Sequence, residues 1–156
     1  MGLLENIQTE PISKLAVRKP IFVDRSCTVR DAILAMRRGK LGCAIVIDSA
    51  EKPVGLFTEA ILRHLIATSP AAVEEDIESH MATTFPWAKI SDPIETVLEA
   101  MELKKIRFVI VVDEQGKVAG LTGQKGLMEY VAEHFSGEVM VQRVGTKPYP
   151  TSREGA

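Results

Sequence analysis

The sequence predicts an α+β fold in which two β-α-β-β-α repeats pack on each other as a pseudo-twofold pair. Three observations support this prediction. In the chain of 156 residues, a shift of 65 positions superimposes residues 35–56 on 100–121 without a gap, so that Ala35-Met36 falls on Ala100-Met101 and Gly55-Leu56 on Gly120-Leu121. Each copy then shows the same succession of apolar patterns. A copy of about 60 residues buries only a marginal share of its surface alone, so the two copies are expected to share one core.

Each copy begins with a short extended stretch, Ile21–Val23 in the first copy, followed by a helix. The apolar residues of this helix recur every three or four positions, and the second copy repeats the spacing: Val29, Ala32, Ile33 and Met36, then Ile94, Val97, Leu98 and Met101. Thr28 with Asp31 predicts a capping box at the first helix. Asp92 followed by Pro93 predicts the N-cap and first residue of the second.

Two short strands and a second helix complete each copy. The first strand is a β-branched run that ends at Asp48 or Asp113, side chains that favour a turn by accepting hydrogen bonds from turn amides. The second strand contains Gly55 or Gly120, a residue typical of strands that bend or approach another backbone. The predicted strands and helices are Ile45–Ile47, Val54–Phe57 and 58–67 in the first copy, then Phe108–Val112, Val118–Thr122 and 123–135 in the second.

The repeat predicts four segments: a first repeat over residues 8–68, a polar linker over 69–76, a second repeat over 77–135, and a C-terminal tail over 136–156. Within the tail, Glu138–Val144 alternates between polar and apolar residues, which predicts a strand added to a sheet edge or to a partner chain. Trp87, after Pro86, is expected in the core or at an interface.

Composition excludes several classes of function. The net charge of −2 and the spread of 19 basic side chains give no basic surface for nucleic acid. No apolar run approaches the roughly 20 residues of a membrane-spanning helix, and two cysteines are too few for a disulfide scaffold, so a cytoplasmic location is expected. The three histidines are scattered, which argues against a metal site. Because no phosphate loop or activated nucleophile is visible, we expect no enzymatic activity.

Two pairs of segments resemble the tandem cystathionine-β-synthase (CBS) domain pair, or Bateman module. They are Cys43–Asp48 with Lys52–Glu59, and Val109–Asp113 with Gly116–Leu121. The resemblance implies a non-catalytic regulatory module whose clefts between the copies bind an adenosine-containing ligand: AMP, ADP, ATP, S-adenosylmethionine or NADH. It also implies a homodimer through the helical faces and a regulated partner protein that the sequence does not identify.

The resemblance also implies two polar residues at the ligand site. Ser or Thr is expected three residues after the strand glycine, and Asp, whose carboxylate would accept both ribose hydroxyls, is expected three residues later. In the first copy these positions hold Thr58 and Ile61, and in the second Gly123 and Gly126, so neither copy carries the carboxylate. Thr58 is equally suited to capping the following helix. The alternative function is therefore a ligand-free structural module for dimerisation or interaction.

A ligand could still be held by backbone contacts around an apolar slot, with the cleft of Thr58 as the better candidate. The predicted ligand-binding residues are Val23, Gly42, Cys43, Ala44 and Thr58, with the counterparts Ala88, Arg107, Phe108 and Val109. The densest basic cluster, Arg37–Lys40, and its counterpart Lys104–Arg107 could meet phosphates, although cations at the end of a helix are commonly just solvated there.

Overall fold

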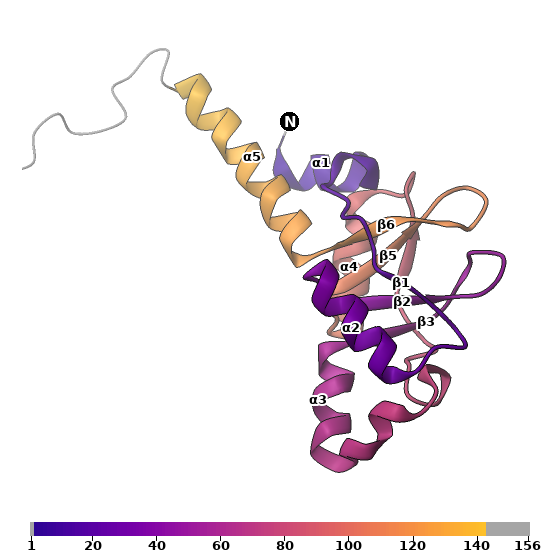
Figure 1. Ribbon diagram of the computed structural model, residues 1–156. Coiled ribbons are helices and arrows are strands. Elements are labelled where there is room, and N and C mark those ends of the chain that lie inside the picture. The colour runs from indigo at the N-terminus through magenta and orange to yellow at the C-terminus, as the bar shows by residue number, and fades with distance from the viewer. Residues whose placement is uncertain (1, 143–156) are drawn as a thin grey trace, which may run out of the picture.

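The computed structural model describes residues 2–142 of the chain (Figure 1). Both copies show the predicted β-α-β-β-α order. The described α-helices and strands are α1 (Leu3–Thr9), β1 (Phe22–Asp24), α2 (Val29–Gly39), β2 (Cys43–Ile47), β3 (Pro53–Thr58), α3 (Glu59–Thr68), β4 (Trp87–Lys89), α4 (Ile94–Lys104), β5 (Phe108–Val112), β6 (Val118–Gly123) and α5 (Gln124–Gln142). Short 3-10 helices span Ile12–Lys14, Pro70–Glu74 and Ile77–Ser79.

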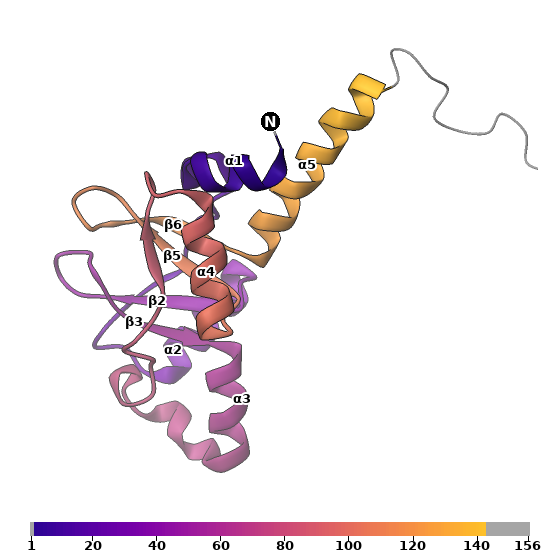
Figure 2. The same cartoon turned by 180° about the vertical axis from the view of Figure 1, so that it is seen from behind.

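Each copy contributes one three-stranded sheet, ordered β1-β2-β3 and β4-β5-β6. The first pair of strands in each sheet is parallel and the second is antiparallel. Figures 1 and 2 show the two sheets stacked, with the hairpin turns on one side of the molecule and helices α3 and α5 on the other. Residues on the helix side of the sheets therefore lie where β3 and β6 end and where α3 and α5 begin.

The two sheets share one core. Their facing side chains form a cluster of fully or nearly fully buried residues: Cys43, Ile45, Leu56, Ile110, Val112 and Leu121. Alternate residues of the same strands, such as Ala44 and Val109, face the helices of their own copy instead. Burial on both faces explains the uninterrupted β-branched runs in the sequence, since successive strand residues point to opposite faces. Two repeats and one shared core are thus confirmed.

The first residues of each copy cross over and pack against the other copy. Ile12 is fully buried in the core of the second copy, and its counterpart Ile77 is fully buried in the core of the first. Further along, Arg18 exchanges two backbone hydrogen bonds with Leu121 of β6. Ala82 makes the equivalent exchange with Leu56 of β3. This crossing brings residues from the start of the chain to the end of β6.

Several local predictions are confirmed. Thr28 and Asp31 form a reciprocal capping box at α2. One carboxylate oxygen of Asp48 accepts the N–H groups of Ala50 and Lys52 at 2.9 and 3.0 Å, and Asp113 accepts two turn amides in the same way. A side chain on Gly120 would meet Val17, from the crossing segment, at 1.9 Å, which explains the glycine.

The tail prediction is wrong where the structure describes it. Residues 138–142 continue helix α5 instead of forming a strand, and residues 143 and 144 lie outside the described residues. An alternating run this short does not separate strand from helix. Because α5 runs directly into the segment, each further residue extends an existing ladder of hydrogen bonds at little cost.

Two predictions in the second copy also need correction. Asp92 does not cap α4, because its carboxylate accepts the N–H of Lys89 at 2.9 Å; Pro93 takes the N-cap position. The carbonyl of Glu10, in the crossing segment, accepts the N–H of Ile94 at 2.9 Å in place of a side-chain cap. Trp87 is 56% exposed, so it does not belong to the core, while its place at an interface stays a prediction. Among the described residues, the helices are all too short or too polar to cross a bilayer.

Candidate functional site

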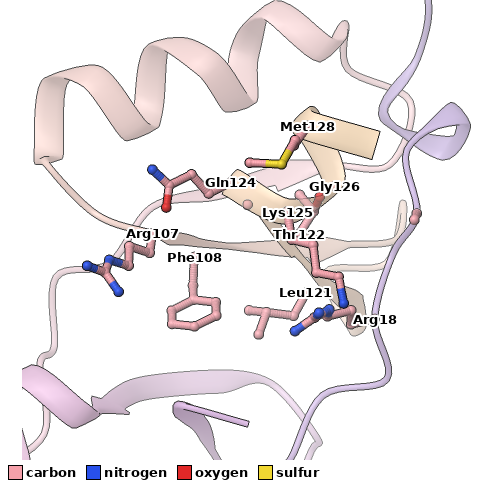
Figure 3. A pocket seen from close by; sticks show the side chains of 11 residues that line it. Arg18, Arg107, Phe108, Leu121, Thr122, Gln124, Lys125, Gly126 and Met128 are labelled. Carbon is pink, nitrogen blue, oxygen red and sulfur yellow. The ribbon is translucent and has the colours of Figure 1, made fainter. Parts of the chain in front are cut away.

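A cavity of about 280 Å³ lies where β6 ends and α5 begins, between the second copy and the segment that crosses from the start of the chain. Figure 3 shows the lining side chains, which come from these three parts of the chain; the guanidinium of Arg107 points away from Arg18 and Lys125. Apolar walls come from Phe108, Leu121 and Met128. The full lining is Ala16, Arg18, Arg107, Phe108, Leu121, Thr122, Gly123, Gln124, Lys125, Gly126 and Met128. Of the residues that the sequence predicts for the second cleft, Arg107 and Phe108 are among these.

Two glycines give the cavity its shape. A Cβ on Gly123 would stand 1.9 Å from the carbonyl oxygen of Arg107, so the strand end fits against that backbone only without a side chain. A Cβ on Gly126 would meet the hydroxyl of Thr122 at 2.7 Å and the carbonyl oxygen of Ala16 at 3.2 Å. The two positions that would hold a hydroxyl and a carboxylate in the family pattern are therefore closely packed glycines without a side chain.

Thr122 carries a buried hydroxyl without a partner. The residue is 3% exposed, and its Oγ1 makes no hydrogen bond in the described structure. Burying such a group without a partner costs roughly 1–3 kcal/mol, and most buried polar groups avoid that cost. Because Thr122 also lines the cavity, a polar group of a ligand is one means of satisfying it.

The charged residues that line the cavity are all cationic. Three of the lining residues are cationic, Arg18, Arg107 and Lys125, and none of the lining residues is acidic. The N-terminus of α5 also borders the cavity, and the positive end of a helix dipole favours an anion. The lining thus provides an apolar wall and an electropositive rim.

The first cleft is built differently at the equivalent positions. The hydroxyl of Thr58 accepts the backbone N–H of Ile61 at 3.3 Å, which confirms its role as the N-cap of α3. A Cβ on Gly42 would lie 3.0–3.2 Å from the carboxyl group of Glu59, so this acidic side chain covers the start of β2. An acidic group occupies the first cleft where the second carries Arg107 and Gln124.

The remaining predicted residues lie inside the protein. Val23, Cys43, Ala44, Ala88 and Val109 are all less than a tenth exposed, and they belong to the three core clusters. Their side chains are therefore committed to packing, and only their backbone atoms could contact a ligand. Sequence reasoning did not place Arg18, Thr122 or Lys125 at the site, because the crossing of the N-terminal segment has no local signal.

The raised pKa values of both cysteine thiols support a packing role for these residues. Burial raises the pKa of the Cys43 thiol to about 12, and burial together with the charges of Asp31 and Asp24 raises the pKa of Cys27. Both thiols are thus protonated near neutral pH, and a thiol in that form is a poor nucleophile. Among the described residues, no group of His, Cys, Asp and Glu side chains has the arrangement of a metal site.

Curated proteins are similar to this chain at low sequence identity. An uncharacterized 17.7 kDa protein of Acidianus ambivalens is 25% identical over 117 residues, which cover 74% of this chain and 70% of the relative. An uncharacterized protein of Helicobacter pylori is 27% identical over 106 residues, which cover 67% of this chain. The match spans only 32% of the Helicobacter protein, so that relative is about three times longer than the matched part.

Solved structures share the fold. The CBS domain protein PAE2072 from Pyrobaculum aerophilum, solved in complex with AMP, has a TM-score of 0.68 at 19% identity, with 78% of this chain and 98% of that chain covered. The CBS domain pair of protein MJ0100, solved with 5′-methylthioadenosine and S-adenosyl-L-methionine, has a TM-score of 0.68 at 20% identity, with 82% and 97% covered. The sequence profile of the CBS domain matches residues 12–68 and again 73–133. This chain therefore belongs to the CBS domain family, as a tandem pair.

Proposed function

We propose that this chain is a non-catalytic regulatory module that senses an adenosine-containing ligand in its second cleft. The cavity beside Arg107 and Phe108 is the observation that carries the proposal, because it joins apolar walls to cationic groups at the predicted position. Similar folds solved with AMP, or with S-adenosyl-L-methionine and 5′-methylthioadenosine, support the class of ligand.

The size of the cavity favours a small member of that class. Its volume of about 280 Å³ is near the lower end of the roughly 300–1,000 Å³ found for small-molecule pockets. A nucleoside monophosphate suits this volume better than a dinucleotide such as NADH. Met128, at 69% exposed, supplies a flexible wall that can adjust to the base.

Thermal unfolding with AMP, ADP, ATP, S-adenosylmethionine and NADH tests this function. A ligand at about 100 times its Kd adds about 2.7 kcal/mol to the free energy of unfolding. For a chain of this size, we expect a rise in Tm of several degrees with at least one of the five compounds. If millimolar concentrations of all five leave Tm unchanged, the alternative function as a ligand-free structural module replaces this one. The absence of the ribose carboxylate in both copies favours that alternative.

The module acts, in this proposal, as a homodimer that alters a partner protein. Large apolar side chains stand exposed on two helices, with Leu34 of α2 at 46%, Leu98 of α4 at 41% and Leu103 of α4 at 81% exposed. Covering such side chains is the usual gain on dimerisation. Sedimentation at tens of micromolar should show a dimer, and Leu98→Lys should shift it toward the monomer. A wild-type species of only about 17 kDa would contradict the dimer.

A further inference from the structure

We propose that the second cleft recognises the phosphate of its ligand and does not read the ribose. The inference rests on the proposed function and narrows it to adenine 5′-nucleotides, ribo and deoxyribo alike. It follows from what lines the cavity: three cations, a helix N-terminus and a buried hydroxyl, with no carboxylate among the lining residues.

The phosphate has several partners available. Arg18 reaches the cavity from the crossing segment, Lys125 from the first turn of α5, and Arg107 from the rim formed by the start of β5 (Figure 3). Hydrogen bonds between these cations and phosphate oxygens are charge-assisted, and they are stronger than neutral ones. The hydroxyl of Thr122, 3% exposed and without a partner, adds a donor on the floor of the same cavity.

The ribose has no carboxylate acceptor among the lining residues. Gly126 stands where a carboxylate would accept both hydroxyls, and Gly123 stands where a second polar side chain would be. Removing the 2′-hydroxyl from a ligand costs affinity when the protein group that bonded to it is left without a partner. Because no carboxylate lines this cavity, we expect little loss of affinity when the 2′-hydroxyl is removed. The same cationic lining disfavours S-adenosylmethionine, whose sulfonium adds a positive charge.

Three matched ligands test the inference by isothermal titration at low salt: AMP, 2′-deoxy-AMP and adenosine. We expect the Kd values of AMP and 2′-deoxy-AMP to agree within about threefold, and adenosine to bind at least about tenfold more weakly than AMP. A preference for AMP over 2′-deoxy-AMP of about tenfold or more, the size expected for a lost charged hydrogen bond, would overturn it. Equal affinity for adenosine and AMP would overturn it as well.

Two neighbouring cations supply a matched pair of variants. Arg18→Gln removes a charge that lines the cavity, whereas Lys19→Gln removes the same charge from an exposed residue outside the lining. We expect Arg18→Gln to weaken AMP binding by about fivefold to tenfold, with Lys19→Gln close to wild type. Indistinguishable AMP affinities of the two variants would contradict the phosphate site.

Gly126→Asp tests the ribose directly. The new Cβ would require the Thr122 hydroxyl to rotate away, since the two would be 2.7 Å apart. The variant should gain a preference for AMP over 2′-deoxy-AMP that the wild type lacks. The failures are distinguishable: if none of the nucleotides binds the wild-type protein, the proposed function falls with the inference, whereas binding with strong ribose discrimination overturns the inference alone.

Discussion

The two clefts occupy equivalent places in the two copies and differ in charge. At the start of the middle strand, the first copy has Gly42 beneath the carboxyl group of Glu59, while the second has the cationic Arg107. The crossing segments widen the difference, because Arg18 bonds to β6 where the small, uncharged Ala82 bonds to β3. The first copy therefore has an acidic side chain and a capping hydroxyl at these positions, and the second has cationic side chains and two glycines.

This difference separates what the fold requires from what a ligand requires. Ile45 and Ile110 hold equivalent positions in the shared core and are both fully buried, so packing keeps them alike. The residues next to the strand ends, such as Arg107, Gln124 and Lys125, are exposed, so their side chains can change without a cost to the core. The pair thus keeps its symmetry in the core and loses it at the clefts.

The largest expected effect tests the symmetry of the cores. Ile12→Ala and Ile77→Ala each remove a fully buried side chain from a crossing segment, and each should cost about 3 kcal/mol in the free energy of urea unfolding. Because the cores are joined, fluorescence of Trp87 and far-UV circular dichroism should report one coincident transition for both variants. Leu4→Ala, at a side chain that is 68% exposed, is the control and should change stability by less than about 0.5 kcal/mol. Separate transitions would show that the copies fold independently.

The next effect tests the asymmetry of the strand ends. Gly123→Ala should destabilise the protein by about 2 kcal/mol, since its Cβ would overlap the carbonyl oxygen of Arg107 at 1.9 Å, and backbone does not move aside cheaply. Gly126→Ala is the comparison: its Cβ would meet the Thr122 hydroxyl at 2.7 Å and the Ala16 carbonyl oxygen at 3.2 Å, both less close than the contact at Gly123, and alanine favours a helix by roughly 0.5–1 kcal/mol. Urea unfolding that finds Gly123→Ala no worse than Gly126→Ala would contradict the close approach.

The pH dependence of stability distinguishes Cys43 from its counterpart Phe108. The pKa of Cys43 is raised to about 12 in the folded protein from 9.0 in the unfolded chain, so the unfolded state alone loses the proton between these values. Its contribution is complete below pH 9 and declines as pH rises toward 12. At pH 10 the loss should be about 1.4 kcal/mol relative to pH 8. Urea unfolding of Cys43→Ala at the same two pH values should lack this component, and an identical decline in the variant would refute the assignment.

The smallest effect concerns the first cleft. Thr58→Ala removes the cap of α3 and should cost about 1 kcal/mol, while Thr58→Ser should retain most of the stability. Because the proposed ligand lies in the other cleft, AMP affinity measured by titration should be unchanged in both variants. If the Thr58→Ala variant is fully folded but no longer binds AMP, the ligand site lies in the first cleft instead.

Sequence patterns predicted the fold well and the site only in part. The repeat, the capping box at Thr28 and the strand runs are encoded in neighbouring residues, whose spacing is visible without a structure. The role of Arg18 depends on a crossing between residues more than 100 positions apart, as its bonds to Leu121 show. The close packing around Gly126 likewise depends on residues distant in the sequence, such as Ala16, and a sequence shows only that the carboxylate is missing.

The most direct test is a crystal structure of the protein with AMP. The central claim is that the clefts have diverged, so that the second one binds the phosphate. We predict density in the second cleft, with the phosphate beside Arg18, Lys125 or Arg107 and with no side chain accepting from the ribose hydroxyls. Density for AMP beside Thr58 and Glu59, with the second cleft empty, would contradict the account.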